Sequence, residues 1–158
     1  MNSNKTYTVQ EALLKLSKYC AYQDRCHKEV EQKLKEMSMI PQASEQIVAY
    51  LLRHDFLNEQ RFALNYAKGK FNQKHWGRIR IKQELKKRDI TEKLIQKALA
   101  QISEKEYKST LKHLAAKKYN EQKQDRSLKA KAKLKNFLMY KGFESQLIYD
   151  EINFLWEA

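Results

Sequence analysis

Glycine and proline are nearly missing from this chain, which has three Gly and one Pro in 158 residues. Hairpins and tight turns draw on these two residue types, so little material is left for β-structure. Ala, Leu, Lys, Glu, Gln and Arg dominate instead, and these side chains lose little rotamer freedom in a helix. The composition predicts an all-α protein of short helices rather than one compact globule.

Long apolar runs are missing as well. No stretch approaches the length of a membrane span, and the first nine residues lack the apolar core of a signal peptide. We therefore expect no membrane attachment and a cytoplasmic location.

Catalytic and metal-binding motifs are also lacking. Cys20 and Cys26, with His27 and His54, do not have the short paired spacing of a zinc site, so we expect reduced thiols. No Ser, Cys or His lies in a recognisable catalytic motif, there is no Gly-rich phosphate loop, and the carboxylates are scattered among lysines rather than clustered as in a nuclease. The sequence predicts no enzyme, no cofactor and no metal.

Acidic residues are outnumbered, with 19 Asp and Glu against 32 Lys and Arg, which gives a net charge of +13. Such an excess is usually kept because a polyanion or an acidic surface neutralises it, although solubility alone is an alternative. Residues 68–88 hold nine basic side chains against Glu84, and residues 105–135 hold eleven against three acidic ones. A charge run is usually a solvated face, but two dense runs in consecutive repeats can form a continuous basic track.

Apolar residues four apart recur along the chain and place two side chains on one helical face each time. The first set of pairs is Val30 and Leu34, Ile81 and Leu85, and Leu134 and Leu138. Ten residues after the last two pairs come Ile95 with Leu99 and Ile148 with Ile152, and the matching pair in the first copy is Ile47 with Leu51, displaced around Pro41. The connectors 88–90 and 141–143 also correspond, which indicates an internal repeat.

Helix-capping residues precede each copy. Thr8 with Glu11 and Ser103 with Glu106 form capping boxes, and Asn58 is a favoured N-cap. The sequence therefore predicts nine helices in three groups of three, an elongated array of three tandem three-helix repeats. Their expected boundaries are 1–56, 57–102 and 103–158. A single compact bundle would explain the helices but not the repeated ten-residue spacing.

Two segments are more specific than periodicity. They are Phe56–Ala63 (FLNEQRFA) and His75–Leu85 (HWGRIRIKQEL). Both resemble the central repeat of the RecX family, and Lys141–Phe143 (KGF) resembles the Gly-Phe of its third repeat. Asn58 and Glu59 stand where that family usually has two aspartates, and Asp89 replaces a usual glycine before Ile90.

The resemblance implies a regulator that binds the filament of RecA on DNA, lies along its groove, and curbs ATP hydrolysis, strand exchange and co-protease activity. Roles in recombination, DNA repair and the SOS response would follow. It implies a monomer with the RecA filament and single- and double-stranded DNA as partners, the latter through phosphate contacts. The alternative is a stand-alone basic helical DNA- or RNA-binding module without a recombinase partner.

The expected contact surface follows the basic track. On a helical wheel that starts at Ile81, Trp76 and Ile79 fall among lysines on the side away from the buried stripe, where they either form a contact surface or pack against the adjacent repeat. We expect Phe56, Leu57, Phe62 and Ala63 to be core, and Tyr140, Tyr149 and Trp156 to complete the core of the last repeat. The candidate filament- and DNA-binding residues are Lys68, Lys70, Lys74, Trp76, Arg78, Arg80, Lys82, Lys86, Lys87, Arg88, Lys129, Lys131, Lys133 and Lys135.

Overall fold

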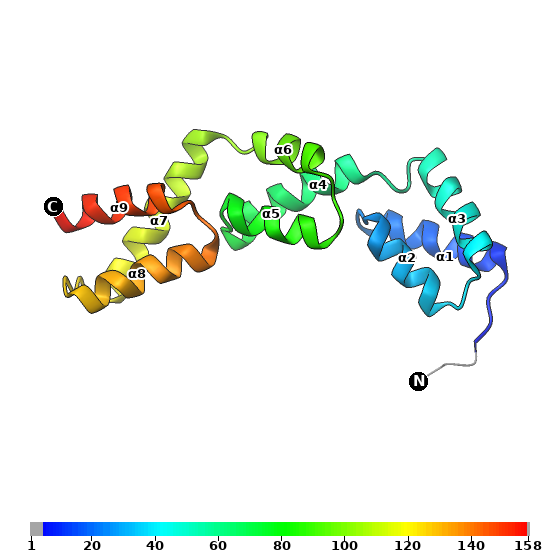
Figure 1. Ribbon diagram of the computed structural model, residues 1–158, viewed down its shortest axis with the longest axis horizontal. Coiled ribbons are helices and arrows are strands. Elements are labelled where there is room, and N and C mark those ends of the chain that lie inside the picture. Colours follow the sequence, from blue (N-terminus) through cyan, green and yellow to red (C-terminus); the bar gives the residue numbers. More distant parts are fainter. Residues whose placement is uncertain (1–4, 158) are drawn as a thin grey trace. The chain divides into compact units, whose positions relative to one another are not determined.

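The computed structural model describes residues 5–157, which form nine α-helices and one π-helical turn and include no β-strand. This confirms the all-α prediction (Figure 1). The helices are α1 (Val9–Tyr22), α2 (His27–Glu36), α3 (Pro41–Arg53), α4 (Glu59–Gly69), α5 (Arg78–Lys87), α6 (Glu92–Ala100), α7 (Glu104–Glu121), α8 (Leu128–Lys141) and α9 (Ser145–Glu157), and the π-helical turn η1 (Lys70–Lys74) follows α4 directly. None of the helices in this part of the chain is both long and apolar enough to cross a membrane.

The helices begin where the capping residues predict. Thr8 and Glu11 form a reciprocal capping box at α1, with the two hydrogen bonds at 3.0 and 3.1 Å. The side-chain oxygen of Asn58 accepts the backbone N–H of Arg61 at 2.9 Å, and the Ser103 hydroxyl caps α7 by accepting the N–H of Glu106 at 3.2 Å. These bonds satisfy backbone donors that the first helical turn leaves unpaired.

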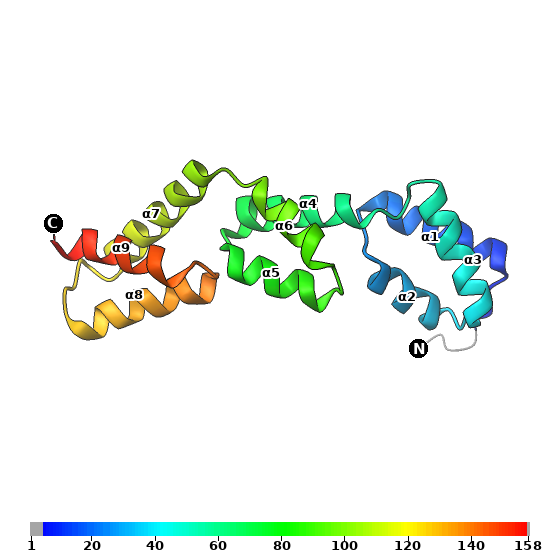
Figure 2. The same cartoon turned by 45° about the horizontal axis from the view of Figure 1, so that its top comes forward.

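The chain divides into two compact units, and the division passes through α4, α5 and α6. The first unit comprises Met1–Asn65 and Leu85–Ile95. In it α1, α2 and α3 pack against one another (Figure 2). Their core is apolar and is made of Ala12, Leu16, Cys20, Val30, Leu34, Met37, Ile47, Leu51 and Leu57.

Arg61, near the start of α4, bonds to two connectors of this first unit. Its guanidinium donates to the carboxylate of Asp24 at 2.7 Å and to that of Asp55 at 2.9 Å. The same group also donates to the carbonyl oxygen of Asp55 at 3.0 Å. The arginine of the FLNEQRFA motif thus joins two connectors to a helix start, because a guanidinium offers several donors in a rigid fork.

The second unit comprises Tyr66–Glu84 and Gln96–Ala158, and in it α7, α8 and α9 pack against one another. Tyr107 and Phe143 are the largest fully buried side chains of this unit, and their rings lie 5.1 Å apart. Leu134, Leu138, Ile148 and Ile152 are also buried, as the repeat spacing predicts.

One turn recurs after the second helix of each repeat. Ser38, Asp89 and Gly142 all have positive φ angles, of 57°, 58° and 98°. The next residue in each case donates its backbone N–H to a helix carbonyl five positions back, at 3.1, 3.1 and 3.3 Å. This is the left-handed helix ending that a glycine favours, and Asp89 adopts it without being a glycine. The correspondence between the connectors 88–90 and 141–143 is therefore confirmed.

The expectations for the core are mostly correct. Leu57, Phe62 and Ala63 are buried, and Phe56 is half-buried. Trp156 packs on Tyr119 with ring centroids 5.3 Å apart, as expected for the end of the last repeat.

Two of the predicted core aromatics are not in the core. Tyr140 is 70% exposed and Tyr149 is 61% exposed, so the prediction for these two was wrong. Both lie on the outer faces of their helices, because Leu138 and Ile148 already supply the buried positions of those turns.

Candidate nucleic-acid interface

The first turn of α5 is fixed by a close backbone contact inside the second unit. The N–H of Gly77 donates to the carbonyl of Lys141 at 2.7 Å, and the N–H of Ile79 donates to the carbonyl of Gly142 at 3.0 Å. A Cβ on Gly77 would lie 2.3 Å from the Gly142 oxygen, and a Cβ on Gly142 would lie 2.4 Å from the Cβ of Arg80. The Trp-Gly and Gly-Phe motifs therefore carry glycine because the two backbones touch.

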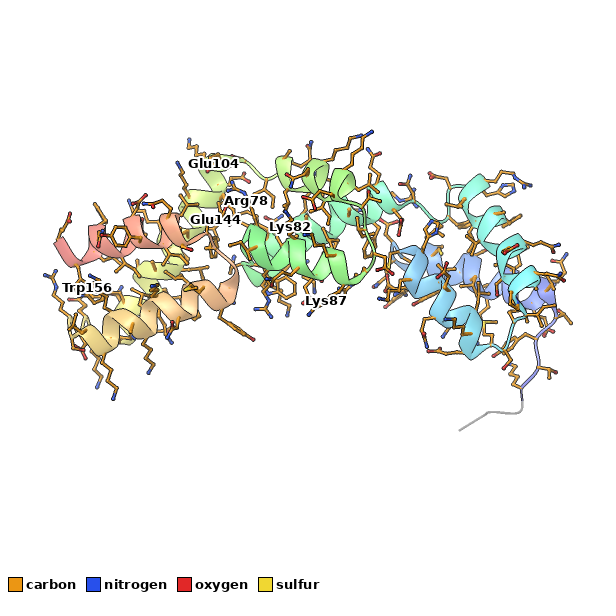
Figure 3. All side chains as sticks on the ribbon, in the orientation of Figure 1. Arg78, Lys82, Lys87, Glu104, Glu144 and Trp156 are labelled. Carbon is orange, nitrogen blue, oxygen red and sulfur yellow. The ribbon has the colours of Figure 1, made fainter. Side chains whose placement is uncertain are left out.

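Arg78 lies next to this contact and is largely buried, with 23% of its side chain exposed. Its guanidinium donates to Glu144 at 2.7 Å, forms an ion pair with Glu104 and lies 3.8 Å from the ring centre of Tyr107. Figure 3 shows the Arg78, Glu104 and Glu144 side chains together. Burial by itself would lower the pKa of Arg78, but the hydrogen bond and charge of Glu144 outweigh it and raise the pKa.

Tyr107 completes this group. Its hydroxyl accepts the backbone N–H of Arg78 at 2.9 Å and donates to the carboxylate of Glu144. Burial, reinforced by the bond to Glu144, raises the pKa of the phenol, so it remains a donor. Arg78 thus joins α5, α7 and the start of α9, and its role as a partner contact remains a prediction.

A cation–aromatic ladder runs across the surface of the second unit, and it consists of Tyr66, Lys70, Trp76, Arg80 and Tyr140. The Lys70 ammonium lies 5.4 Å from the ring centre of Tyr66 and 5.1 Å from that of Trp76. The Arg80 guanidinium lies 4.2 Å from the Trp76 ring centre and 4.6 Å from that of Tyr140. Aromatic faces attract cations, so the ladder holds two positive charges beside two half-buried rings, Tyr66 and Trp76, and one exposed ring, Tyr140.

The π-helical turn η1 places part of this ladder. Phe71 is buried and stacks on Tyr107, with ring centroids 5.8 Å apart. The Lys70 carbonyl accepts the N–H of Trp76 at 3.2 Å, so the turn ends next to the helix that follows. Lys74 is exposed, and its carbonyl accepts a bond from the Lys141 ammonium at 3.1 Å. Such π-turns are common at functional sites.

The four candidate lysines of α8 lie on two different stripes of that helix. Lys129 and Lys133 are both exposed, and they share a stripe with Tyr140, the outermost member of the ladder. Lys131 and Lys135 instead line a groove between α8 and α9. Lys129 and Lys133 therefore share a helix face with one member of the ladder, Tyr140, and Lys131 and Lys135 do not.

The remaining candidates lie in α4, in α5 and, for Arg88, directly after α5. Lys68 is exposed, and Lys82 and Arg88 are half-buried. Lys86 forms an ion pair with Glu92 at 3.9 Å, and the carbonyl of Lys87 accepts a bond from Lys28 at 2.8 Å. Lys86 and Lys87 keep exposed side chains in the first unit.

Trp76 and Ile79 differ in how far they are exposed for contact with a partner. Ile79 is 41% exposed, so it is available as a contact residue. Trp76 is half-buried and packs edge-on against Tyr66 at 6.4 Å between the centroids. Tyr140 is the ladder member that the sequence argument assigned elsewhere, and its spacing from Lys129 and Lys133 on one helical stripe was the signal that could have identified it.

The two thiols do not resemble reactive cysteines. Both are buried, and burial raises the pKa of Cys20 and raises that of Cys26 to about 11. A thiol in this state is protonated at neutral pH and is a weak nucleophile. Within residues 5–157, no group of three or more His, Cys, Asp or Glu side chains is arranged to hold a metal ion.

The fold and this surface define a class of basic proteins built from tandem three-helix domains. The family model "RecX, second three-helix domain" matches residues 58–99, and "RecX, third three-helix domain" matches residues 104–152. The chain therefore belongs to the RecX family of regulatory proteins.

Individual relatives agree with this assignment. The chain is 36% identical over 119 residues to "Regulatory protein RecX" of Serratia proteamaculans, an alignment that covers 73% of this chain and 69% of the relative. It is 34% identical over 114 residues to the protein of that name from Yersinia enterocolitica, with 70% and 66% covered. The crystal structure of RecX from Lactobacillus salivarius superposes with a TM-score of 0.83 at 27% identity, covering 95% of this chain and 97% of that one. These matches confirm the predicted tandem three-helix plan.

Proposed function

We propose that this protein regulates RecA by binding the RecA–DNA filament along its groove and impairing its recombinase, ATPase and co-protease activities. The observation that carries the proposal is membership of the RecX family, and the basic and aromatic surface supports it. A net charge of +13 suits a partner made of DNA phosphates and acidic protein side chains. On this proposal the protein acts as a monomer and as a regulator rather than a catalyst.

The candidate residues would contribute in different ways. The exposed lysines of α4, η1, α5 and α8 would neutralise phosphates or acidic side chains of the filament, and each neutralised phosphate would release a counterion. Trp76 and Arg80 would add planar contacts, because both hold fixed orientations in the ladder. Arg78 would contribute mainly by holding α5 in place, since both of its carboxylate partners are internal.

The test is the ATPase rate of RecA on single-stranded DNA as this protein is added, with bare-DNA binding measured in parallel. Inhibition below the concentration that coats bare DNA is the expected result. A Lys86→Glu/Lys87→Glu variant should need about tenfold more protein for the same inhibition, because two attractions become repulsions. The matched control is Lys18→Glu/Lys35→Glu, which makes the same charge change at exposed residues outside the two basic runs.

An unchanged ATPase rate at low salt would contradict the proposal. One observation favours a second function, a stand-alone nucleic-acid-binding module: Tyr140 offers an exposed ring beside the Arg80 cation, where a base can stack. That function predicts tight binding of bare DNA or RNA that weakens steeply with salt, and RecA inhibition only when the DNA is saturated.

A further inference from the structure

A groove between α8 and α9 contains no member of the cation–aromatic ladder and has its own chemistry. It has a volume of about 500 Å³. Its lining comprises Leu128, Lys131, Ala132, Lys135, Ser145, Gln146, Ile148, Tyr149 and Ile152. The lining is apolar at its floor, bears two lysines on one wall and includes no carboxylate.

The groove exposes large apolar side chains that a protein usually buries. Leu128 is 83% exposed at one end, and the ring of Tyr149 is exposed on the α9 wall. On α8 the lining residues are spaced at i, i+3, i+4 and i+7, the spacing of one helix face. A helix laid into such a groove would bury these side chains along its own apolar stripe.

The positive charges of Lys131 and Lys135 on the α8 side of the groove favour an acidic partner. Neither Lys131 nor Lys135 is ion-paired to a carboxylate among residues 5–157, so both charges are available. Lys131 lines the groove and is half-buried, and the methylene stem of a lysine can lie along apolar surface while its ammonium group stays in water. Two rim lysines beside an apolar floor complement a helix that carries Glu or Asp next to aliphatic or aromatic anchors.

The first unit contains a corresponding groove that serves as an internal comparison. It lies between α2 and α3 with a volume of about 450 Å³. By the repeat spacing, Glu31 stands where the second unit has Lys135, Glu45 stands where it has Gln146, and Val48 stands where it has Tyr149. The first-unit groove is lined by two carboxylates, Glu31 and Glu45, and by one lysine, Lys35. The second-unit groove is lined by two lysines and no carboxylate, and it includes the Tyr149 ring. A lysine rim is a property of this sequence and does not follow from the fold alone.

We propose that the α8–α9 groove binds an acidic amphipathic helix of a partner protein through its apolar floor and the Lys131 and Lys135 rim. This goes beyond the filament proposal, since it requires neither DNA nor the ladder. It also separates the lysines of α8 into two functions. Lys131 and Lys135 bind the helix, whereas Lys129 and Lys133 lie on the stripe that leads to Tyr140.

The probe is a fluorescein-labelled synthetic peptide of about 15 residues, near the length at which isolated helices become stable. It carries Leu at i, i+3, i+4 and i+7 and Glu at most other positions, and a second peptide has Lys in place of each Glu. Binding to the full-length protein is followed by fluorescence anisotropy at about 0.15 M salt, where charges farther apart than roughly 8 Å are screened. We expect the acidic peptide to bind and the basic one not to bind.

Three variants locate the site. Lys131→Glu/Lys135→Glu should weaken binding of the acidic peptide by about tenfold, because two attractions become repulsions. Lys129→Glu/Lys133→Glu makes the same charge change on the same helix and should stay within about twofold. Ala132→Trp fills the groove without altering the charge and should also weaken binding by about tenfold. Circular dichroism confirms that each variant is folded.

Equal losses in the two lysine variants, or equal affinity for the two peptides, would overturn the proposal, because binding would then be general electrostatics. It would also be overturned if an oligo(dT) strand bound and only Lys131→Glu/Lys135→Glu abolished that binding, which would make the groove a nucleic-acid site. A third contrary result is self-association that Ala132→Trp abolishes, seen by sedimentation velocity, since a second copy would then occupy the groove. None of these assays contains RecA, so their failure would leave the filament proposal standing.

Discussion

Replacing Gly77 by alanine should destabilise the second unit by about 3–4 kcal/mol. The added Cβ would lie 2.3 Å from the Gly142 oxygen, whereas ordinary contacts begin near 3.4 Å, so the two backbones must separate by about 1 Å. That movement would stretch the 2.7 Å bond from Gly77 to Lys141 and the 3.0 Å bond from Ile79 to Gly142 beyond hydrogen-bonding range. Two lost bonds at roughly 1 kcal/mol each, together with strain of roughly 1–2 kcal/mol, give the stated sum.

The assay is urea and thermal unfolding followed by tryptophan fluorescence. Trp76 and Trp156 are the two tryptophans of the chain and both lie in the second unit, so their fluorescence monitors that unit. A loss of about 3 kcal/mol should lower the thermal midpoint by roughly 6–12 °C in a protein of this size.

Gly69→Ala is the matched control. Gly69 has helical angles, with φ −64° and ψ −45°, and a Cβ there would meet no atom within 4 Å. Alanine restricts the unfolded chain at no steric cost, so this variant should be stabilised by about 0.4–1 kcal/mol. If both variants unfolded within about 0.5 kcal/mol of the parent protein, the argument from the close backbone contact would be refuted.

Three further changes have outcomes that the structure predicts. Asp89→Gly should raise the free energy of unfolding by about 0.5–1 kcal/mol, because glycine adopts the positive φ at little cost. The ion pair with Lys28 that this change removes is exposed and contributes little. A lower urea midpoint, followed by circular dichroism, would contradict this. Arg78→Ala should cost about 2–3 kcal/mol in tryptophan-monitored unfolding, since it leaves the half-buried Glu144 carboxylate without a positive partner. A neutral result would show that the ion pairs are dispensable. Burial raises the pKa of Cys26 to about 11, so above pH 9 the unfolded state loses the thiol proton first. The free energy of unfolding should therefore fall as the pH rises towards 11. The thermal midpoint should depend less steeply on pH in Cys26→Ala, and an identical slope would refute the assignment.

The repeat pattern predicted the fold well because each helix buries residues at regular spacing. Val30 with Leu34, Ile81 with Leu85, and Leu134 with Leu138 are all fully buried, as the spacing predicts. The starts of the helices could be predicted equally well, since a capping side chain bonds to backbone groups within three residues of itself. These features are local in the chain, so one sequence suffices to find them. The domain boundaries at 56 and 102 remain a prediction.

The site depended on contacts that one sequence does not contain. Arg78 is 66 residues from Glu144 and 26 from Glu104, and its place in a basic run gave no sign that it is paired internally. Tyr140 was assigned to the core because aromatic residues near a repeat end are usually buried, yet Leu138 fills the position that faces inward. The π-helical turn η1 has no periodicity that distinguishes it from α4, so Lys70 could not be placed beside Trp76 beforehand.

The contact between Gly77 and the turn at Gly142 is made almost entirely of peptide groups. Peptide groups are the same in every residue, so this joint does not depend on which side chains α5 and α8 display to the solvent. The exposed side chains of those helices can therefore be substituted by residues of another charge or type while the contact keeps its geometry. The protein thereby offers a scaffold on which the binding preference can be redesigned one stripe at a time.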